Sequence, residues 1–123
     1  MARLESSTTE TNGIEIGFGR SGNGFAYFDL IGDATYTDYG FRFIRQNSGP
    51  NASTELNHRG TGTLLFRAED AGNMAFYTNN AERVYIKSNG FVGFNQGNPL
   101  ERIHLGDGNI YLPASNLSRG ALS

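Results

Sequence analysis

Residues 82–94 read ERVYIKSNGFVGF, and this stretch decides the fold that we predict for the chain. Val84 and Ile86 alternate with Tyr85 and Lys87, which is the period-two pattern of a strand with two different faces. An Asn-Gly pair follows, and this pair favours a tight hairpin turn because both residue types tolerate positive φ. A second short apolar run completes the stretch. The segment therefore predicts a β-hairpin.

Short strand candidates recur along the rest of the chain at roughly ten-residue spacing, separated by Gly, Asn, Asp and Pro. They occupy residues 13–18, 24–31, 35–45, 53–59, 62–68, 74–78, 82–87, 91–95, 101–105 and 109–112. No window of helical periodicity is long enough for a stable helix, so we expect almost none. This pattern predicts an all-β chain folded as a compact, antiparallel, β-sandwich-like module.

The composition limits what the chain can be. Its 123 residues form one domain or less, with 17 glycines and neither cysteine nor tryptophan. A disulfide framework or a thiolate metal site is therefore excluded. The formal net charge is −2 and the basic residues are scattered, so we expect no nucleic-acid partner. No apolar run is long enough to span a membrane or to serve as a signal peptide, and we expect a soluble product without a membrane partner.

Alternating apolar side chains define the predicted core. A strand with apolar residues on both faces, such as residues 26–31, needs cover on both sides. Because so short a chain buries a limited fraction of its surface, we expect the second cover to be another subunit. The side chains predicted to lie in the core or at the subunit interface are Phe28, Phe41, Phe43, Phe66, Phe76, Val84, Ile86 and Phe94.

The chain is predicted to have three parts: an extended arm over residues 1–12, the β module over 13–112, and a tail over 113–123. The arm is rich in Ser, Thr, Glu and Asn, so we expect it to be ordered only by an outside contact. Because the chain starts with methionine and contains a single module, we expect it to be a complete product.

Several motifs suggest chemistry, and each has a simpler explanation. Residues 17–22 read GFGRSG, the spelling of a dinucleotide-binding loop, but a strand rather than a helix is predicted to follow. His58 and His104 lie far apart in sequence and lack metal-ligand spacing. Asp29, Asp33 and Asp38 lack the spacing of a calcium loop, and the last two are better explained as turn formers. We therefore expect no cofactor, no metal and no enzymatic activity.

The hairpin resembles a module of bacteriophage tail-fibre-like and capsid decoration proteins, in which E-R-x-x-I is followed by G-x-V-G. The likeness includes the lead-in TNNAER at residues 78–83, the segment 24–45, SGPN at 48–51 and HRGTG at 58–62, and it covers about residues 12–112. One departure is an aromatic residue, Phe94, where the repeat usually has a small aliphatic residue. The resemblance implies a β-structured homotrimer with no catalytic residues.

From the resemblance and the short chain, we expect a capsid decoration (cement) protein that is made in the host cytoplasm and lies on the capsid surface of the virion. Its partners would be other copies of itself and the major capsid protein, which would be bound through the arm. Leu4 is the expected anchor of that arm, with Arg3 and Glu5 as polar partners.

Two other functions remain open. A tail-fibre or receptor-binding component could use exposed aromatic side chains to stack on sugars, although cross-strand packing and subunit contact explain these residues better; they are Tyr36, Tyr39, Tyr77 and Tyr111. A polysaccharide-degrading tailspike would need a pair of carboxylates across a groove, and a module of this size has no repeated solenoid to build one.

Overall fold

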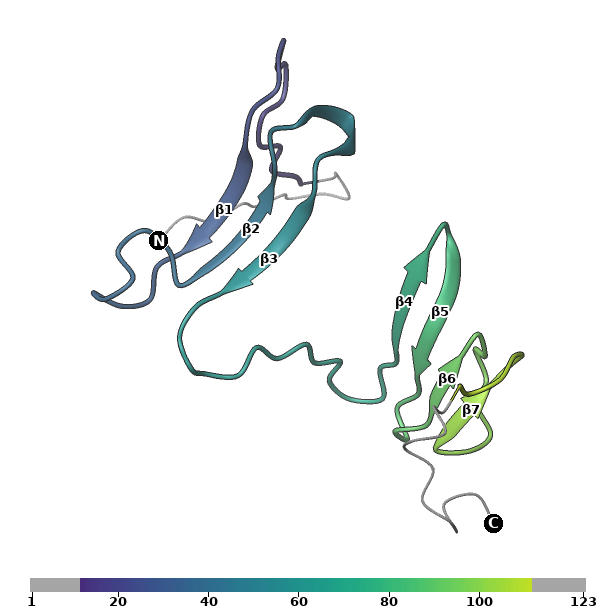
Figure 1. Cartoon of the computed structure of the whole chain (residues 1–123). Coiled ribbons are helices and arrows are strands. Elements are labelled where there is room, and N and C mark those ends of the chain that lie inside the picture. The colour runs from purple at the N-terminus through teal and green to yellow at the C-terminus, as the bar shows by residue number, and fades with distance from the viewer. Residues whose placement is uncertain (1–11, 112–123) are drawn as a thin grey trace. The chain divides into compact units, whose positions relative to one another are not determined.

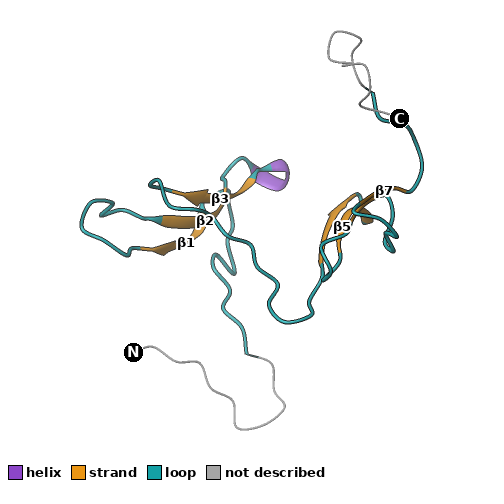
Figure 2. Ribbon diagram, turned by 90° about the horizontal axis from the view of Figure 1, so that it is seen from below, coloured by secondary structure: helices purple, strands orange, loops and turns teal. Residues whose placement is uncertain are grey.

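The computed structural model describes residues 12–111, and its contacts divide the chain into two compact units, Met1–Leu64 and Leu65–Ser123. Each unit contains one open sheet, with three strands in the first and four in the second (Figure 1). The single helical segment within 12–111 is η1, a 3-10 turn at Gly49–Asn51 (Figure 2). The all-β class and the near absence of helix are therefore confirmed for this part of the chain. The sequence suggests one module over 13–112, and its homotrimeric assembly stays a prediction.

The first sheet is an antiparallel meander of β1 (Ala26–Leu30), β2 (Phe41–Arg45) and β3 (Thr54–His58), with β2 in the centre. Phe43 pairs with Phe28 on one side and with Leu56 on the other. Since successive side chains point to opposite faces of a strand, this register places the three apolar side chains on one face. Residues 41–45 therefore alternate between the two faces of the sheet.

The loop between β1 and β2 is longer than predicted, because the strand expected from residue 35 begins only at Phe41. The carboxylate of Asp33 accepts hydrogen bonds from the backbone N–H groups of Thr35 (2.7 Å) and Tyr36 (2.9 Å). These donors are then not available to a strand ladder, and the chain turns instead. The prediction that Asp33 forms a turn is confirmed.

The second sheet has the strand order β4-β5-β6-β7. Its strands are β4 (Met74–Thr78), β5 (Ala81–Ile86), β6 (Val92–Phe94) and β7 (Ile103–Leu105). The β4–β5 turn consists of Asn79 and Asn80, which have φ of 50° and 56°. Two central residues with positive φ are the mark of a type I′ turn, which matches the twist of the strands it joins. The tightest hairpin of the chain is thus formed by Asn-Asn.

The hairpin predicted at residues 82–94 is present as β5 and β6, but its turn differs from the one expected. The N–H of Lys87 donates to the carbonyl of Phe91 (2.9 Å), and the N–H of Gly90 donates to the carbonyl of Lys87 (2.8 Å). Among the turn residues only Gly90 has positive φ, at 86°, while the side chain of Asn89 accepts a hydrogen bond from the N–H of Phe91 (3.0 Å). This is the pattern of a three-residue loop with a glycine bulge, in which only the glycine of the Asn-Gly pair needs positive φ.

The last strand pairs differently from a purely antiparallel module, because β7 runs parallel to β6. Residues 95–102 carry the chain back to the start of β6, and the turn contains Asn95 with φ of 52° and the fully buried Pro99. Two glycines make this tight return possible. A Cβ on Gly93 would collide with the carbonyl of Gln96, and a Cβ on Gly106 would collide with the carbonyl of Asn95.

Three predicted strands are wrong. In the first of these segments, residues 13–15 are irregular and residues 16–19 form a turn, where Gly17 and Gly19 have positive φ. Residues 62–68 and 109–111 form no strand, and Leu112 lies outside the described range. A strand exists only where a neighbouring chain segment accepts and donates its ladder hydrogen bonds, and apolar alternation alone does not supply that neighbour.

Each sheet leaves large side chains partly exposed. Among the described residues only Ile44 and Ala52 are buried hydrophobic residues. The predicted core residues group by sheet instead. Phe28, Phe41 and Phe43 lie in the first sheet, and Phe76, Val84, Ile86 and Phe94 lie in the second. Phe66 lies in a segment without a strand, with 59% of its surface exposed. None of the eight is buried within the chain, so their role at a subunit interface stays a prediction.

Replacing Gly93 with alanine is expected to destabilise the protein, because the new methyl group would push against the backbone carbonyl of Gln96. Overpacking of this kind typically costs about 1–3 kcal/mol in unfolding free energy. Urea unfolding monitored by circular dichroism measures the effect. Gly62→Ala is the matched control, since a Cβ there meets nothing within 4 Å, and it should leave stability unchanged or slightly raised. Equal stability of the two variants would contradict the proposed close approach.

Candidate interaction surfaces

The second sheet has one mainly apolar face, which we call the apolar face of the second sheet. The strand register forms it from two complete rows of side chains that run across all four strands. The first row is Met74, Ile86, Val92 and Ile103, and the second row is Phe76, Val84, Phe94 and Leu105. Four of the predicted core residues lie on it. No charged or hydrogen-bonding side chain interrupts these rows.

This face is open to solvent in the chain as described. Phe76 is 52% exposed, Phe94 is 44% exposed and Ile103 is 66% exposed. The opposite face differs in character, since its central row consists of Ala75, Tyr85, Gly93 and His104. The two faces of the sheet are therefore chemically distinct, and the large aliphatic side chains gather on one of them.

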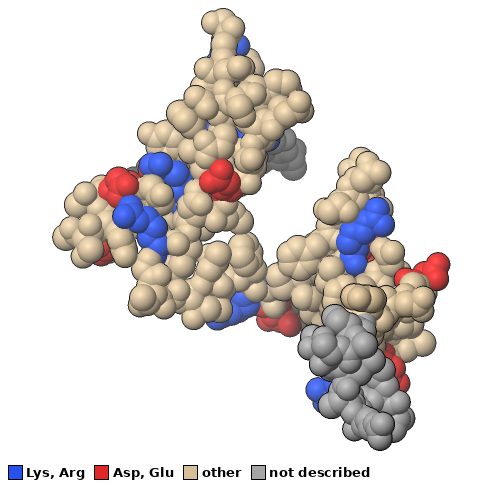
Figure 3. Space-filling model, viewed as in Figure 1, with Lys and Arg blue, Asp and Glu red and all other residues tan. Residues whose placement is uncertain are grey.

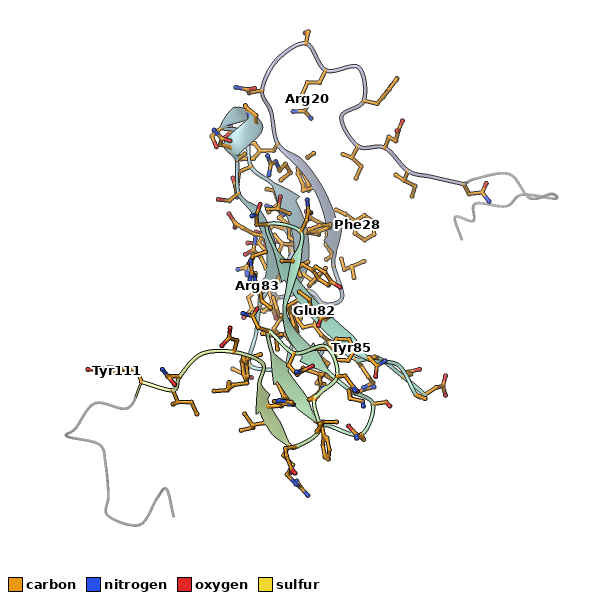
Figure 4. The ribbon with its side chains drawn as sticks, turned by 90° about the vertical axis from the view of Figure 1, so that its right-hand side faces the viewer. Arg20, Phe28, Glu82, Arg83, Tyr85 and Tyr111 are labelled. Carbon is orange, nitrogen blue, oxygen red and sulfur yellow. The ribbon has the colours of Figure 1, made fainter. Side chains whose placement is uncertain are left out.

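The first sheet has one mainly apolar face. Phe28, Phe43 and Leu56 form its central row across the three strands. The row on one side is Leu30, Phe41 and His58, and the row on the other side is Ala26, Arg45 and Thr54. The ring of Phe28 projects away from β1 in Figure 4, and 54% of its surface is exposed. Each sheet thus presents one apolar face to solvent.

The other face of the first sheet is covered by arginine and tyrosine side chains. Arg42 forms a two-pronged ion pair with Asp29, from Nε to Oδ1 at 2.6 Å and from Nη2 to Oδ2 at 2.7 Å. Its guanidinium lies 4.6 Å from the ring centre of Tyr27 and 4.0 Å from that of Tyr39. Contacts of this length are favourable cation–π interactions, so one cation is held both by a carboxylate and by two rings.

A second arginine extends this arrangement. The guanidinium of Arg59 lies 4.3 Å from the ring centre of Tyr36 and 5.1 Å from that of Tyr39, and its Nη1 is 2.7 Å from Oδ1 of Asp38. Tyr39 is therefore shared by both arginines. We call these residues the Arg–Tyr cluster; they are Tyr27, Asp29, Tyr36, Asp38, Tyr39, Arg42 and Arg59. Figure 3 shows basic and acidic side chains next to each other over the first unit, as these pairs require.

The Arg–Tyr cluster fastens the β1–β2 loop to the sheet. Tyr36, Asp38 and Tyr39 belong to the loop, whereas Arg42 lies in β2 and Arg59 follows β3. Backbone bonds hold the end of the loop as well, because the N–H of Gly40 donates to Leu30 and the N–H of Arg59 donates to Gly40, both at 2.9 Å. Two of the four tyrosines that were candidates for stacking on sugars, Tyr36 and Tyr39, are engaged here with guanidinium groups.

Both carboxyl groups of the cluster are stabilised in their charged form. Hydrogen bonds from the Arg42 guanidinium lower the pKa of Asp29 below its ordinary value, despite opposing desolvation. The backbone N–H of Tyr39 is the main cause that lowers the pKa of Asp38, and Arg59 adds to it. Both carboxylates therefore stay ionised to lower pH than a free aspartate.

The other predicted sites are held in local structure. Residues 17–22 form a turn before β1, with Arg20 donating to the carbonyl of Phe25 at 2.9 Å, so no helix receives a pyrophosphate there (Figure 4). A ring nitrogen of His58 is 2.9 Å from the carbonyl of Gly62, and Nδ1 of His104 accepts the N–H of Leu100 at 3.2 Å. Within residues 12–111 no three histidine or acidic side chains are close enough to hold a metal ion together.

Two features of the described region bear on partners. No helix within residues 12–111 has the length and apolar character needed to cross a membrane. The capsid-binding residues predicted in the arm, Arg3, Leu4 and Glu5, lie outside the range that the structure describes.

Arg42 and Arg59 are the interacting residues that sequence reasoning missed. The alternation of Phe41 and Phe43 with Arg42 places this arginine on the face opposite the apolar row, which is the one signal that the sequence offers. Its ionic partner depends on the pairing of Asp29 with Arg42 across two strands, and the sequence does not specify that register.

A scan against known protein families finds no family that matches this chain. A search of curated proteins also finds no match.

Acid is expected to loosen the first unit. Because the pKa values of Asp29 and Asp38 are lowered in the folded protein, their contribution to stability is present above the ordinary value of 3.8 and is lost as the pH falls through the lowered values. Hydrogen exchange of the amides in residues 31–45, measured as a function of pH, should show this loss of protection. Asp29→Asn should weaken the acid effect, whereas the matched variant Asp107→Asn in the second unit should leave it intact. An identical acid profile for Asp29→Asn and the unsubstituted chain would contradict this role.

Proposed function

We propose that this chain is a non-enzymatic structural protein of a bacteriophage virion, a homotrimer that decorates the capsid and stabilises the shell. The observation that carries the proposal is the pair of open apolar sheet faces. Apolar surface of this extent is typical of proteins that bury it against a partner. The resemblance of the hairpin at residues 82–94 to virion proteins supports the choice of assembly.

Attachment would be mechanical. The arm of residues 1–12 would bind the major capsid protein, with Leu4 as the apolar anchor and Arg3 and Glu5 as its polar partners. A segment of this length reaches at most roughly 40 Å when extended, which is enough to cross from one capsid subunit to the next. Three arms on one trimer would bind together, so weak single contacts would sum to tight attachment. A trimer also matches the threefold symmetry positions of a capsid.

A tail-fibre or receptor-binding role is the second candidate, and one observation favours it. Tyr77 and Tyr111 are 60% and 86% exposed, so their rings are open to a ligand in the described chain. An aromatic ring open to solvent can stack on a sugar of a host surface. The two roles differ in copy number per virion, because a capsid decoration protein occupies many equivalent sites and a fibre occupies few. Quantitative mass spectrometry of purified virions distinguishes them.

Deleting residues 1–12 is expected to abolish binding to capsids of the encoding phage while leaving the fold and self-association unchanged. Co-sedimentation with capsids that lack the protein measures binding, and circular dichroism checks the fold. Leu4→Asp should weaken binding at least tenfold, since it places a charge at the anchor. Ser6→Asp adds the same charge nearby and is the matched control. Normal decoration by the truncated protein would rule out the arm as the attachment element.

A further inference from the structure

We propose that the apolar face of the second sheet is the surface through which copies of this chain pack on one another. This inference rests on the self-association in the proposed function and does not depend on the capsid. The face combines two uninterrupted apolar rows with substantial exposure at Phe76, Phe94 and Ile103. Such a surface gains stability when it leaves water, in proportion to the apolar area that is buried.

The exposed area of this face is substantial for so short a chain. If a large apolar side chain offers roughly 150–200 Å², the exposed fractions of Phe76, Phe94 and Ile103 leave about 240–320 Å² open. The other five side chains of the two rows are half-buried and add to this area; they are Met74, Val84, Ile86, Val92 and Leu105. An exposed apolar patch of this size is often a functional surface.

The molecule that covers the apolar face of the second sheet must be present whenever the chain folds. Folding costs conformational entropy that the burial of apolar surface has to offset, and Ile44 and Ala52 are the buried hydrophobic residues of the described chain. The fold therefore needs further burial to be stable at all. A different protein would have to be present in equal number to every folded molecule of this chain. Other copies of the chain meet this condition because they are made together.

The chemistry of the face also fits a second copy. Its rows contain no charge or hydrogen-bonding group that would have to be matched by a complementary group on a different protein. A uniformly apolar surface is complementary to itself, which is the property that a symmetric contact between identical chains requires. Obligate homo-oligomer interfaces have this apolar character.

Thiol labelling tests this assignment directly, because the chain has no cysteine and a single substitution introduces the only thiol. Ile103→Cys places it on the apolar face, and Arg102→Cys places it on the neighbouring exposed residue outside the face. In the assembled protein we expect the Ile103→Cys thiol to react with a maleimide at least tenfold more slowly than the Arg102→Cys thiol. The two rates should converge in urea and should approach each other on dilution.

Two results of this experiment would overturn the inference. Equal labelling rates in the native protein at all concentrations would mean that the face is open. Slow labelling of Ile103→Cys in a protein that sediments as a monomer would mean that the chain covers the face itself. Both rates and the sedimentation coefficient are measured on the same samples.

A charge on the face provides a second test. Phe76→Asp is expected to shift the sedimentation profile towards the monomer, because the carboxylate would be buried without a partner on association. Ala75→Asp lies next to it in β4 on the opposite face and should leave the profile unchanged. An unchanged oligomer with Phe76→Asp would contradict the inference. If the oligomer forms through this face but does not bind capsids, the proposed function fails and the inference stands. If the protein binds capsids while this face stays open to solvent, the inference fails and the proposed function stands.

Discussion

The pairing register of β5 determines the chemistry of the whole second sheet. Side chains alternate between faces, so a slip of one residue would turn Val84 and Ile86 away from Phe76 and Met74 and break both apolar rows. A β-bulge marks the place where the register changes: Phe76 pairs with Val84, Tyr77 pairs with Glu82, and Arg83 is the extra residue. Everything proposed about this face depends on that register.

Arg83 secures the bulge from both sides. Its Nε donates to Oγ1 of Thr78 at 3.0 Å, its Nη1 donates to Oδ1 of Asn95 at 3.4 Å, and its carbonyl accepts the N–H of Asn95 at 2.9 Å. The residue is thus bonded to the strand before it and to the end of the strand after it. Glu82 and Arg83, labelled in Figure 4, begin the hairpin motif, and the arginine has a structural reason to be there.

The sequence predicts the hairpins well and the connections poorly. The boundaries of residues 74–78 and the alternation of residues 41–45 follow from local side-chain period, and the turn at Asp33 follows from the chemistry of one carboxylate. The parallel pairing of β7 and the coil at 62–68 depend on which segments meet in space. The Arg–Tyr cluster joins residues from three separate segments, so only the fold reveals it. The apolar face of the second sheet lies between these cases. Phe76, Val84, Ile86 and Phe94 were predicted as core or interface residues, but the residues that complete its rows and the grouping by sheet were not.

The strand β7 has a consequence for how such a chain avoids uncontrolled growth. Any open sheet ends in a strand whose outer N–H and C=O groups can recruit another strand, which leads to fibrils. Here that edge is three residues long, and Gly106 and Gly108 follow it, the latter with φ of 107°. An edge so short gives an incoming strand few bonds. The β7 edge therefore offers little to an incoming strand, whereas β4, the other edge of the same sheet, is five residues long.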